Sequence, residues 1–326
     1  MPKPRIISGI QPTGKPHLGN YLGSLKHFVE LQDSGTYDCY FFIADLHSLT
    51  ENLEPKQKHA DVLEVVATFL ALGLDPKKST LFLQSAIPAH TQLAWIFSTL
   101  TPMGELERMT QYKDKAGRQK NNVNVGLFTY PVLQAADILL YKPAAVPVGQ
   151  DQIQHVELAR TIARKFNAKY GETFPEPKIM LTTVPKVMSL LEPEKKMSKS
   201  LGDQHVLNLA DEPDITQKKL TRAVTATQGG GNNPGVENLL TMLEQFDTSQ
   251  AKHFGEQEKA GTIRYAELKA ALTETLTKAF TTFRTTRTDL LAQAEKCATV
   301  LDAGAKAATK VAEATLAEVT KKIGLN

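Results

Sequence analysis

Near its start the chain reads Arg5-Ile6-Ile7-Ser8-Gly9-Ile10-Gln11-Pro12-Thr13-Gly14-Lys15-Pro16-His17-Leu18-Gly19-Asn20. The apolar run Arg5 to Ile10 predicts a strand, and the turn rich in Gly and Pro ends it. A helical pattern follows from Leu18 to about Gln32, and a second apolar run, Tyr37 to Ala44, predicts another strand. Strand, helix and strand in this order favour a βαβ unit, in which the two strands are parallel.

The same alternation continues through the first two thirds of the chain. It predicts a helix at Pro55–Leu72, a strand at Ser79–Gln84, a helix at Thr91–Leu100, helical segments at Phe128–Tyr141 and Asp151–Tyr170, and a short strand at Val146–Val148. This pattern is typical of an α/β fold with a Rossmann-like, doubly wound parallel sheet. After Gly202 strand signals disappear, and Thr262 to Lys296 is a long helical pattern. We therefore expect a Rossmann-like domain at residues 1–206 and an all-helical domain at 207–326.

Composition restricts the class of protein. The 326 residues are 41% hydrophobic and carry a net charge of +3, far from the basicity of a chromatin protein. Cys39 and Cys297 are the only cysteines, so we expect neither a disulfide framework nor a structural metal site. The N-terminus lacks the apolar core of a signal peptide, and no run of about eighteen apolar residues occurs. We expect a cytoplasmic protein without a membrane span.

The segment Gly9 to Pro16 resembles the phosphate-binding loop of P-loop NTPases, including its Gly14-Lys15 pair. Pro16, however, stands where that loop needs the Ser or Thr hydroxyl that holds magnesium. The sequence therefore argues against a P-loop NTPase.

A different nucleotide site is indicated by His17-Leu18-Gly19-Asn20 at the opening of the first helix. Gly19 and Gly23 lie on one helical face, where missing side chains would let a flat base approach the backbone. His17 and Asn20 become donors near a triphosphate at the carboxyl end of the first strand. The alternative is that His17 only caps or packs the helix.

A second phosphate-handling segment is Lys196-Met197-Ser198-Lys199-Ser200. Two lysines and two hydroxyls can stabilise the charge that builds on a pyrophosphate leaving group. A basic pentamer alone is usually a solvated loop. Its pairing with the His17 to Asn20 segment, in this order, favours the catalytic interpretation.

These two segments resemble the HIGH and KMSKS signatures of class I aminoacyl-tRNA synthetases. Three further stretches, Ser8–Gly14, Tyr130–Tyr141 and Val146–Gln152, resemble the tryptophanyl-tRNA synthetase family. The resemblance is specific from about Ser8 to Ser200. It implies activation of L-tryptophan with ATP and Mg²⁺, transfer to tRNA(Trp), a homodimer, and a helical domain that binds the anticodon.

The resemblance also implies roles for individual residues. The catalytic groups would be His17, Asn20, Lys196 and Lys199. The ATP-binding residues would be Gln11, Pro12, Thr13, Gly19, Asn20, Gly149, Gln150, Asp151, Val187 and the segment Lys196, Met197, Ser198, Lys199, Ser200, and the tryptophan-binding residues Asp137, Tyr130 and Gln152. Lys113 and Lys115 are further candidates for phosphate contact. Positions that depart from the family pattern include Gln134, Gln150 and Leu201-Gly202-Asp203.

The residues also favour tryptophan as the substrate. Asp137 is an acid inside an apolar helical run, where an ionised carboxylate is costly unless a donor meets it. An indole N–H is a donor with no acceptor, and it suits such a carboxylate. The alternative is a structural acid paired with a backbone group or an arginine.

Three other functions compete with this interpretation. Tyrosyl-tRNA synthetase has the same fold, but the Ala135-Ala136-Asp137-Ile138-Leu139 run favours tryptophan. A non-catalytic paralogue that senses tryptophan or binds RNA has no use for the intact lysines at 196 and 199. An adenylyltransferase lacks the long helical C-terminal part.

Overall fold

The computed structural model describes residues 2–51, 54–110, 123–182, 186–226 and 233–325. These residues form two compact units, each built from separated parts of the chain. The first unit combines Met1–Gly14, His27–Thr183 and Leu290–Asn326, and the second combines Lys15–Lys26 with Val184–Asp289.

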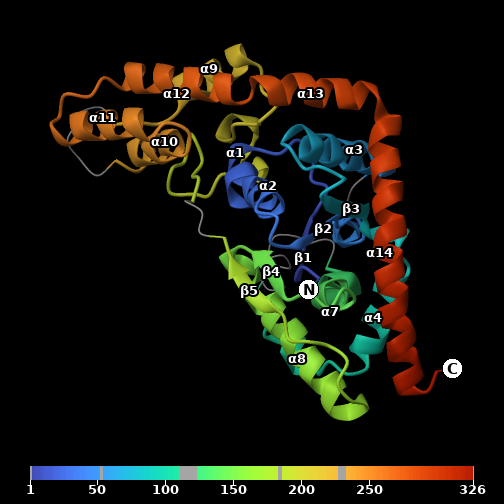
Figure 1. Cartoon of the computed structure of the whole chain (residues 1–326). Helices are drawn as coiled ribbons and strands as arrows, with labels where there is room; N and C mark the ends of the chain where they lie inside the picture. Colours follow the sequence, from blue (N-terminus) through green and yellow to red (C-terminus); the bar gives the residue numbers. More distant parts are fainter. Residues whose placement is uncertain (1, 52–53, 111–122, 183–185, 227–232, 326) are drawn as a thin grey trace. The chain divides into compact units, whose positions relative to one another are not determined.

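The first unit contains a five-stranded sheet in which every pairing is parallel (Figure 1). The strand order is β3-β2-β1-β4-β5, so β1 lies at the centre, with Ile6 opposite both Cys39 and Ala145. The strands are β1 (Arg5–Ile10), β2 (Asp38–Ile43), β3 (Ser79–Leu83), β4 (Ala145–Val148) and β5 (Lys178–Leu181).

Helices cover both faces because neighbouring strand residues point to opposite sides. Phe41 stacks on Phe28 of α2, which also contacts Phe69 of α3. The next residue, Phe42, belongs to the core on the opposite face, together with side chains of the remaining helices. The helices of this unit are α2 (Lys26–Asp33), α3 (Pro55–Ala71), α4 (Ala89–Ser98), α5 (Met103–Glu107), α7 (Val125–Leu139), α8 (Ile153–Tyr170) and α14 (Ala294–Ile323).

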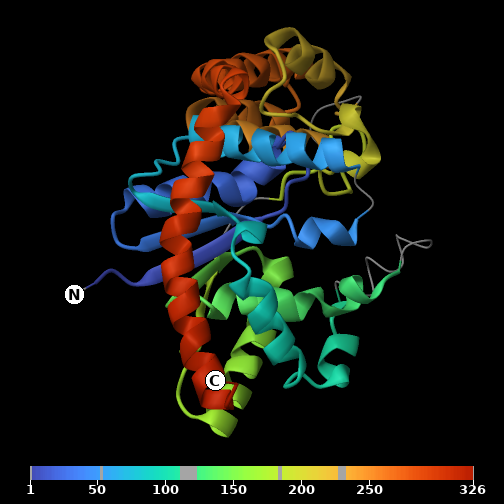
Figure 2. The same cartoon turned by 90° about the vertical axis from the view of Figure 1, so that its right-hand side faces the viewer.

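The C-terminal helix α14 covers the edge strand β3. It packs on β3 and contacts α3 and α4, as Figures 1 and 2 show. Gly304 makes this approach possible, because a Cβ there would lie 1.9 Å from the carbonyl oxygen of Leu81. Lys142 also pairs with Glu318 at 2.6 Å. An edge strand that is covered in this way cannot pair with another chain.

The second unit is helical. Tyr21 of η1 is half-buried, stacked on Phe246 and edge-on to Phe280. Asn238 is buried and holds the backbone of Met188 through two hydrogen bonds of 2.9 Å. The helices are α1 (Leu18–Asn20), the π-helical η1 (Tyr21–Leu25), the 3-10 turns η5 (Lys199–Leu201) and η6 (Asp203–His205), α9 (Pro213–Arg222), α10 (Pro234–Glu244), α11 (Thr248–Lys259), α12 (Tyr265–Ala279) and most of α13 (Thr281–Ala292).

The predicted fold class is confirmed: a parallel sheet with flanking helices, and helices in the C-terminal part. The predicted strands correspond to β1–β4, whereas β5 was not predicted; its four residues are exposed or half-buried and show no alternation. The long helical pattern from Thr262 is interrupted at Phe280 and Gln293. The two spatial units are built from separated stretches of the chain: Lys15–Lys26 belong with the second unit, and Leu290–Asn326 return to the first.

Among the described residues, no helix combines the length and the apolar character that crossing a bilayer requires.

Replacing Gly304 with alanine tests the packing of α14 on β3. The added methyl group collides with rigid backbone, and such overpacking costs about 1–3 kcal/mol. We expect Gly304→Ala to lower the melting temperature measured by circular dichroism.

The matched control is Gly255→Ala in α11, where nothing lies within 4 Å of an added Cβ. Alanine is the better helix former by about 0.5–1 kcal/mol, so this variant should melt at the same temperature or higher. Equal melting temperatures for wild type and Gly304→Ala would contradict the close approach.

Candidate active site

The carboxyl ends of β1 and β4 are neighbours in the sheet, at the point where the order of strands reverses. Open α/β sheets bind ligands at such a point. Residues 11–13 follow β1, and Gly149 follows β4 and begins the 3-10 turn η4 (Gln150–Gln152). A Cβ on Gly149 would lie 3.0 Å from Oδ1 of Asp151, so a side chain there would crowd the turn. The first unit therefore brings together the predicted residues Gln11, Pro12, Thr13, Gly149, Gln150 and Asp151 at adjacent strand ends.

Gln152 connects this turn to helix α7. Its Nε2 donates to Oδ2 of Asp151 at 2.8 Å, and its Oε1 accepts from Nε2 of Gln134 at 3.1 Å. Gln134 lies in α7 three residues before Asp137. The turn after β4 and the helix that carries the predicted substrate residues are thus joined by side-chain amides.

Asp137 is completely buried, and its carboxylate is held by three side chains. Nε2 of His47 lies 2.7 Å from Oδ2, and Nδ1 of His90 lies 2.6 Å from Oδ1. Nε2 of Gln84 donates to both oxygens, at 2.8 and 2.9 Å. An ionised carboxylate has about four acceptor positions, and these four contacts occupy them, so a further donor would have to replace one of the contacts.

Two of these donors follow strands β2 and β3, and the third, His90, lies in the first turn of α4. His47 begins the 3-10 turn η2 (His47–Thr50) after β2, and Gln84 begins η3 (Gln84–Ala86) directly after β3. Oε1 of Gln84 accepts from the backbone N–H of Leu46 at 3.1 Å, which turns its NH₂ group toward Asp137. Nε2 of His90 is in turn 2.9 Å from the hydroxyl of Tyr141. The backbone N–H of Leu46 thus orients Gln84, and the hydroxyl of Tyr141 orients His90.

The electrostatics of Asp137 follow from this geometry. Complete burial opposes ionisation, but the hydrogen bonds from His47 and His90 outweigh it and lower the pKa of the Asp137 carboxyl group to about 2. Burial, followed by the nearby Asp137 charge, raises the pKa of Tyr141, so its phenol keeps its proton. The Asp137 carboxyl group is therefore ionised at neutral pH.

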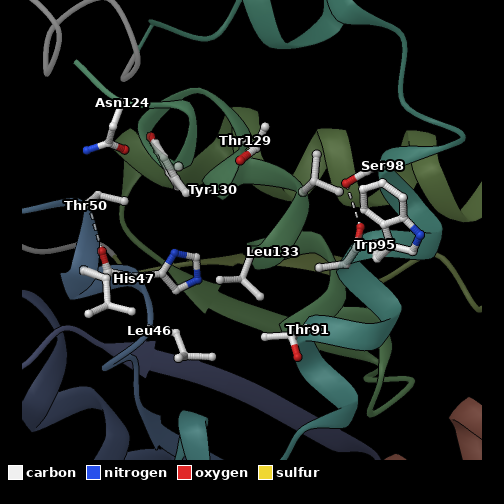
Figure 3. A pocket seen from close by; sticks show the side chains of 14 residues that line it. Leu46, His47, Thr50, Thr91, Trp95, Ser98, Asn124, Thr129, Tyr130 and Leu133 are labelled. Atoms are coloured by element: carbon white, nitrogen blue, oxygen red, sulfur yellow. Dashed lines mark hydrogen bonds between the residues drawn. The ribbon is translucent and has the colours of Figure 1, made fainter.

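A pocket of about 400 Å³ lies between η2, α4 and α7. Figure 3 shows His47 and Tyr130 toward one end, Trp95 toward the other and Leu133 between them. The hydroxyl of Tyr130 is 3.0 Å from Nε2 of His155, and burial raises the pKa of Tyr130 to about 12. Because His47 lines this pocket and contacts Asp137, the buried charge lies directly behind the pocket wall.

The second unit holds the HIGH-like segment against a short extended stretch. The N–H of Leu18 donates to the carbonyl of Leu207 at 2.8 Å, and the N–H of Leu209 donates to the carbonyl of Pro16 at 3.0 Å. His17 thereby lies opposite Asn208 in an antiparallel bridge. Its own N–H donates to Oδ1 of Asn20 at 3.1 Å, which caps the start of α1.

The KMSKS segment begins as one strand of a small hairpin. Met188 and Lys196 form an antiparallel bridge, and the N–H of Met197 donates to the carbonyl of Val187 at 3.0 Å. Met197 and Val187 are buried, whereas Lys196 is exposed. A Cβ on Gly19 would lie 3.8 Å from Cβ of Val187. The hairpin and the HIGH-like segment are therefore neighbours within this unit.

His17 experiences the charges of the KMSKS lysines. Burial, followed by the positive charges of Lys199 and Lys196, lowers the pKa of His17 from 6.5 to about 4. The imidazole is therefore neutral at neutral pH. Its Nδ1 atom is buried and has no hydrogen-bond partner among the described residues. A buried polar atom of this kind is suited to meet a ligand.

The predicted site residues fall into two groups. The first unit contains Gln11, Pro12, Thr13, Tyr130, Asp137, Gly149, Gln150, Asp151 and Gln152, and the second contains His17, Gly19, Asn20, Val187, Lys196, Met197, Ser198, Lys199 and Ser200. Lys113 and Lys115 lie outside the described residues.

Sequence reasoning did not find the partners of Asp137. Gln84, His47 and His90 are 53, 90 and 47 positions away along the chain. They are also neither the backbone group nor the arginine considered as alternatives. One feature of the sequence could have indicated two of them: Gln84 and His47 come shortly after predicted parallel strands, and the carboxyl ends of such strands meet at one edge of the sheet.

The sequence and the fold of the chain are similar to those of known proteins. The family model described as "tRNA synthetases class I (W and Y)" matches residues 2–281. A tryptophan–tRNA ligase of Caldanaerobacter subterraneus subsp. tengcongensis is 44% identical over 98% of both chains, and tryptophan–tRNA ligase 2 of Streptomyces avermitilis is 43% identical over 99% of this chain and 97% of that protein. The crystal structure of tryptophanyl-tRNA synthetase from Campylobacter jejuni, complexed with ADP and tryptophan, has a TM-score of 0.86 and 36% identity, covering 98% of this chain and 99% of that one.

The low pKa of His17 gives a prediction for titration by NMR. We expect the imidazole Cε1 proton of His17, assigned with a His17→Gln variant, to titrate near pH 4. Lys199→Ala removes a positive charge that disfavours protonation, so it should raise the midpoint. The midpoint should stay below 6.5 because burial persists.

The control is Lys218→Ala, which removes an exposed lysine that pairs with Asp214. It should leave the His17 midpoint unchanged. Equal shifts in the two variants would show that Lys199 exerts no specific effect on the imidazole.

Proposed function

The chain belongs to the class I tRNA synthetases of the tryptophan and tyrosine group, and from this premise we propose that it activates L-tryptophan with ATP and transfers it to tRNA(Trp). The observation that carries the proposal is the 44% identity, over 98% of both chains, to a tryptophan–tRNA ligase. The family model alone does not separate tryptophan from tyrosine. The full-length relatives do, since they bear the name tryptophan–tRNA ligase.

Tryptophan would bind in the first unit beside Asp137. An indole N–H is a donor only, and the Asp137 carboxylate is an acceptor only, held ionised by His47 and His90. A tyrosine hydroxyl can also donate, so the carboxylate alone does not choose between the two rings, and the tryptophan–tRNA ligases among the relatives support tryptophan. Tyr130 and Gln152 would contact the substrate's ammonium group.

ATP would bind as its magnesium complex, with the metal arriving as part of the substrate. The nucleoside would be contacted by the segment after β1 (Gln11, Pro12 and Thr13), the segment after β4 (Gly149, Gln150 and Asp151), Gly19 and Val187. The phosphates would be contacted by His17, Asn20 and the KMSKS segment (Lys196, Met197, Ser198, Lys199 and Ser200). A neutral imidazole donates a hydrogen bond without competing with the lysines for the phosphate charge.

Activation joins the tryptophan carboxylate to the α-phosphorus of ATP. A carboxylate oxygen forms a bond to that phosphorus, and the bond from phosphorus to the bridging oxygen of pyrophosphate breaks. Negative charge accumulates on the departing pyrophosphate, and Lys196 and Lys199 stabilise it. The 2′-hydroxyl of the terminal tRNA ribose then attacks the activated carbonyl, its proton is lost, and AMP leaves. Positioning and charge stabilisation suffice, because no side chain forms a covalent bond.

The tRNA would contact the helical part of the chain from residue 207 onward. Arg284 and Arg287 are candidate contacts in α13. Nη2 of Arg284 donates to the carbonyl of Thr277 at 2.8 Å, which holds one edge of its guanidinium. Aminoacylation of tRNA(Trp) with a substituted anticodon measures this role.

Because aminoacyl-tRNA is consumed in translation, we place the activity in the cytoplasm, which cell fractionation tests.

Pyrophosphate exchange tests the activation step. We expect labelled pyrophosphate to enter ATP when tryptophan is present, and not when tyrosine replaces it. Lys199→Ala should lower the exchange rate at saturation by about 100-fold, because one group that stabilises the leaving charge is lost. Asp137→Asn should instead raise the tryptophan concentration for half-maximal exchange by about 10-fold or more, with little effect on that for ATP.

Lys218→Ala is the control for both variants and should match the wild type. Exchange with tyrosine would favour tyrosyl-tRNA synthetase. Tryptophan binding without exchange would favour a non-catalytic paralogue that senses tryptophan.

We also propose that the chain forms a homodimer, through exposed apolar side chains around the pocket of Figure 3. Leu49 and Trp95 line this pocket and are 63% and 73% exposed. Val125, between two lining residues, is 77% exposed. Apolar side chains gathered in this way are typical of protein interfaces.

Sedimentation velocity should give about twice the mass of 35.8 kDa. Trp95→Glu should shift the protein toward the monomer, because a charge at an apolar interface is desolvated without a partner. Leu325→Glu alters another exposed apolar residue, 68% exposed near the C-terminus, and should leave the mass unchanged. A dimer that survives Trp95→Glu and dissociates with Leu325→Glu would contradict this surface.

A further inference from the structure

The second unit contains a buried lysine outside the predicted phosphate-binding groups. Lys219 of α9 is 1% exposed, and its Nζ lies 2.8 Å from Oδ2 of Asp203 and 2.8 Å from Oδ2 of Asp211. A lysine is almost never buried without partners, because desolvation of its charge is costly. The two carboxylates compensate this cost.

Asn208 completes the cluster. Its Nδ2 donates to Oδ1 of Asp203 at 2.9 Å and to Oδ1 of Asp211 at 3.2 Å. Its backbone N–H donates to Oδ2 of Asp211 at 3.0 Å. The hydrogen bond from Lys219, opposed by burial and assisted by Asn208, lowers the pKa of Asp203. Lys219, Asp203, Asp211 and Asn208, here called the Lys219 cluster, therefore form a closed ionic network.

One side of the Lys219 cluster holds the end of the KMSKS segment. Lys199 begins the turn η5, and the N–H of Gly202 donates to its carbonyl at 2.9 Å. Gly202 has φ of 114°, a conformation that favours glycine, and Asp203 follows directly. The Asp203 carboxylate thus fixes the chain four positions after Lys199.

The other side of the cluster holds the partner of His17. Asn208 bridges His17, and its neighbours Leu207 and Leu209 make the hydrogen bonds that flank His17 on both sides. Asp211 binds the backbone of Asn208, and Lys219 binds Asp211. A single buried ammonium group therefore connects the stretch that holds His17 with the base of the loop that holds Lys199.

We propose that Lys219 is a positioning residue that fixes, through Asp203 and Asp211, where Lys196 and Lys199 stand relative to His17. The inference rests on the proposed function, since it concerns the groups that would contact the phosphates. Lys219 is too deeply buried to touch a substrate, and it acts only through its two partners. Misplacement of a catalytic group by about 1 Å can reduce a rate by about 100-fold.

The neighbouring pair Lys218 and Asp214 provides a matched control. It has the same chemistry, with 3.3 Å between charged atoms, but its side chains are 68% and 63% exposed. Exposed pairs of this kind contribute little to stability. Lys218→Met and Asp214→Asn should therefore resemble the wild type in every measurement.

The principal variants are Lys219→Met and Asp203→Asn. Lys219→Met removes the ammonium and leaves the largely enclosed Asp211 carboxylate without its cation, so it is expected to fold less well. Asp203 is 65% exposed at its side chain, so Asp203→Asn should melt close to the wild type. We expect Asp203→Asn to lower the maximal rate of tryptophan-dependent pyrophosphate exchange by about 10-fold or more, with less than a twofold change in the KM for tryptophan.

The titration of His17 separates displacement of the loop from a simple loss of charge. Removal of the Asp203 carboxylate alone makes the surroundings more positive and lowers the pKa of His17. Displacement of Lys199 away from the imidazole raises it. The proposal requires a higher His17 midpoint by NMR in Asp203→Asn, and a slower exchange rate.

Two results would overturn the proposal: an unchanged exchange rate, or a lower rate with a His17 midpoint that is unchanged or lower. Failure of the proposed function looks different, because wild-type protein would then show no tryptophan-dependent exchange. In that case the NMR titration still decides whether Lys219 and Asp203 position the loop.

Discussion

The parallel pairing of β1 between β2 and β4 is the constraint on which the first unit depends. Parallel strands end at the same edge of a sheet, so the segments after β1, β2, β3 and β4 are all carried to that edge. The segments after β1 and β4 meet at the point of reversal, and those after β2 and β3 supply the donors to Asp137. The parallel sheet thus places two regions at one edge: the turns after β1 and β4, and the side chains after β2 and β3 that contact Asp137.

The two units carry charged groups of opposite sign at their candidate sites. In the first, a buried carboxylate is kept ionised by His47, His90 and Gln84, which favours a ligand that only donates. In the second, Lys196 and Lys199 lie near an imidazole that burial and the same lysines keep neutral, which favours an anion. The two substrates differ correspondingly: the indole only donates a hydrogen bond, whereas the triphosphate carries negative charge. The buried carboxylate of the first unit therefore suits the indole, and the lysines of the second unit suit the phosphates of ATP.

Buried ionic groups recur where segments distant in sequence have to be held in register. Asp137 ties two strand ends to α7, and Lys219 ties α9 to the stretch opposite His17 and to the end of the KMSKS segment. Removing one partner from such a group leaves an uncompensated charge, which is more costly than the loss of an apolar contact. This cost makes the positions of the attached segments well defined.

The sequence by itself determined the strands β1–β4, the fold class and the two signature segments, because apolar periodicity and short motifs are properties of neighbouring residues. It also singled out Asp137, since an acid in an apolar run is visible locally. Only the tertiary structure decided that His47, Gln84 and His90 hold that acid, that Lys219 is buried between two aspartates, that β5 pairs at the far edge, and that α14 packs on the sheet. These features depend on contacts between residues 8 to more than 200 positions apart, and local pattern carries no information about which of many lysines, histidines or helices will meet such partners.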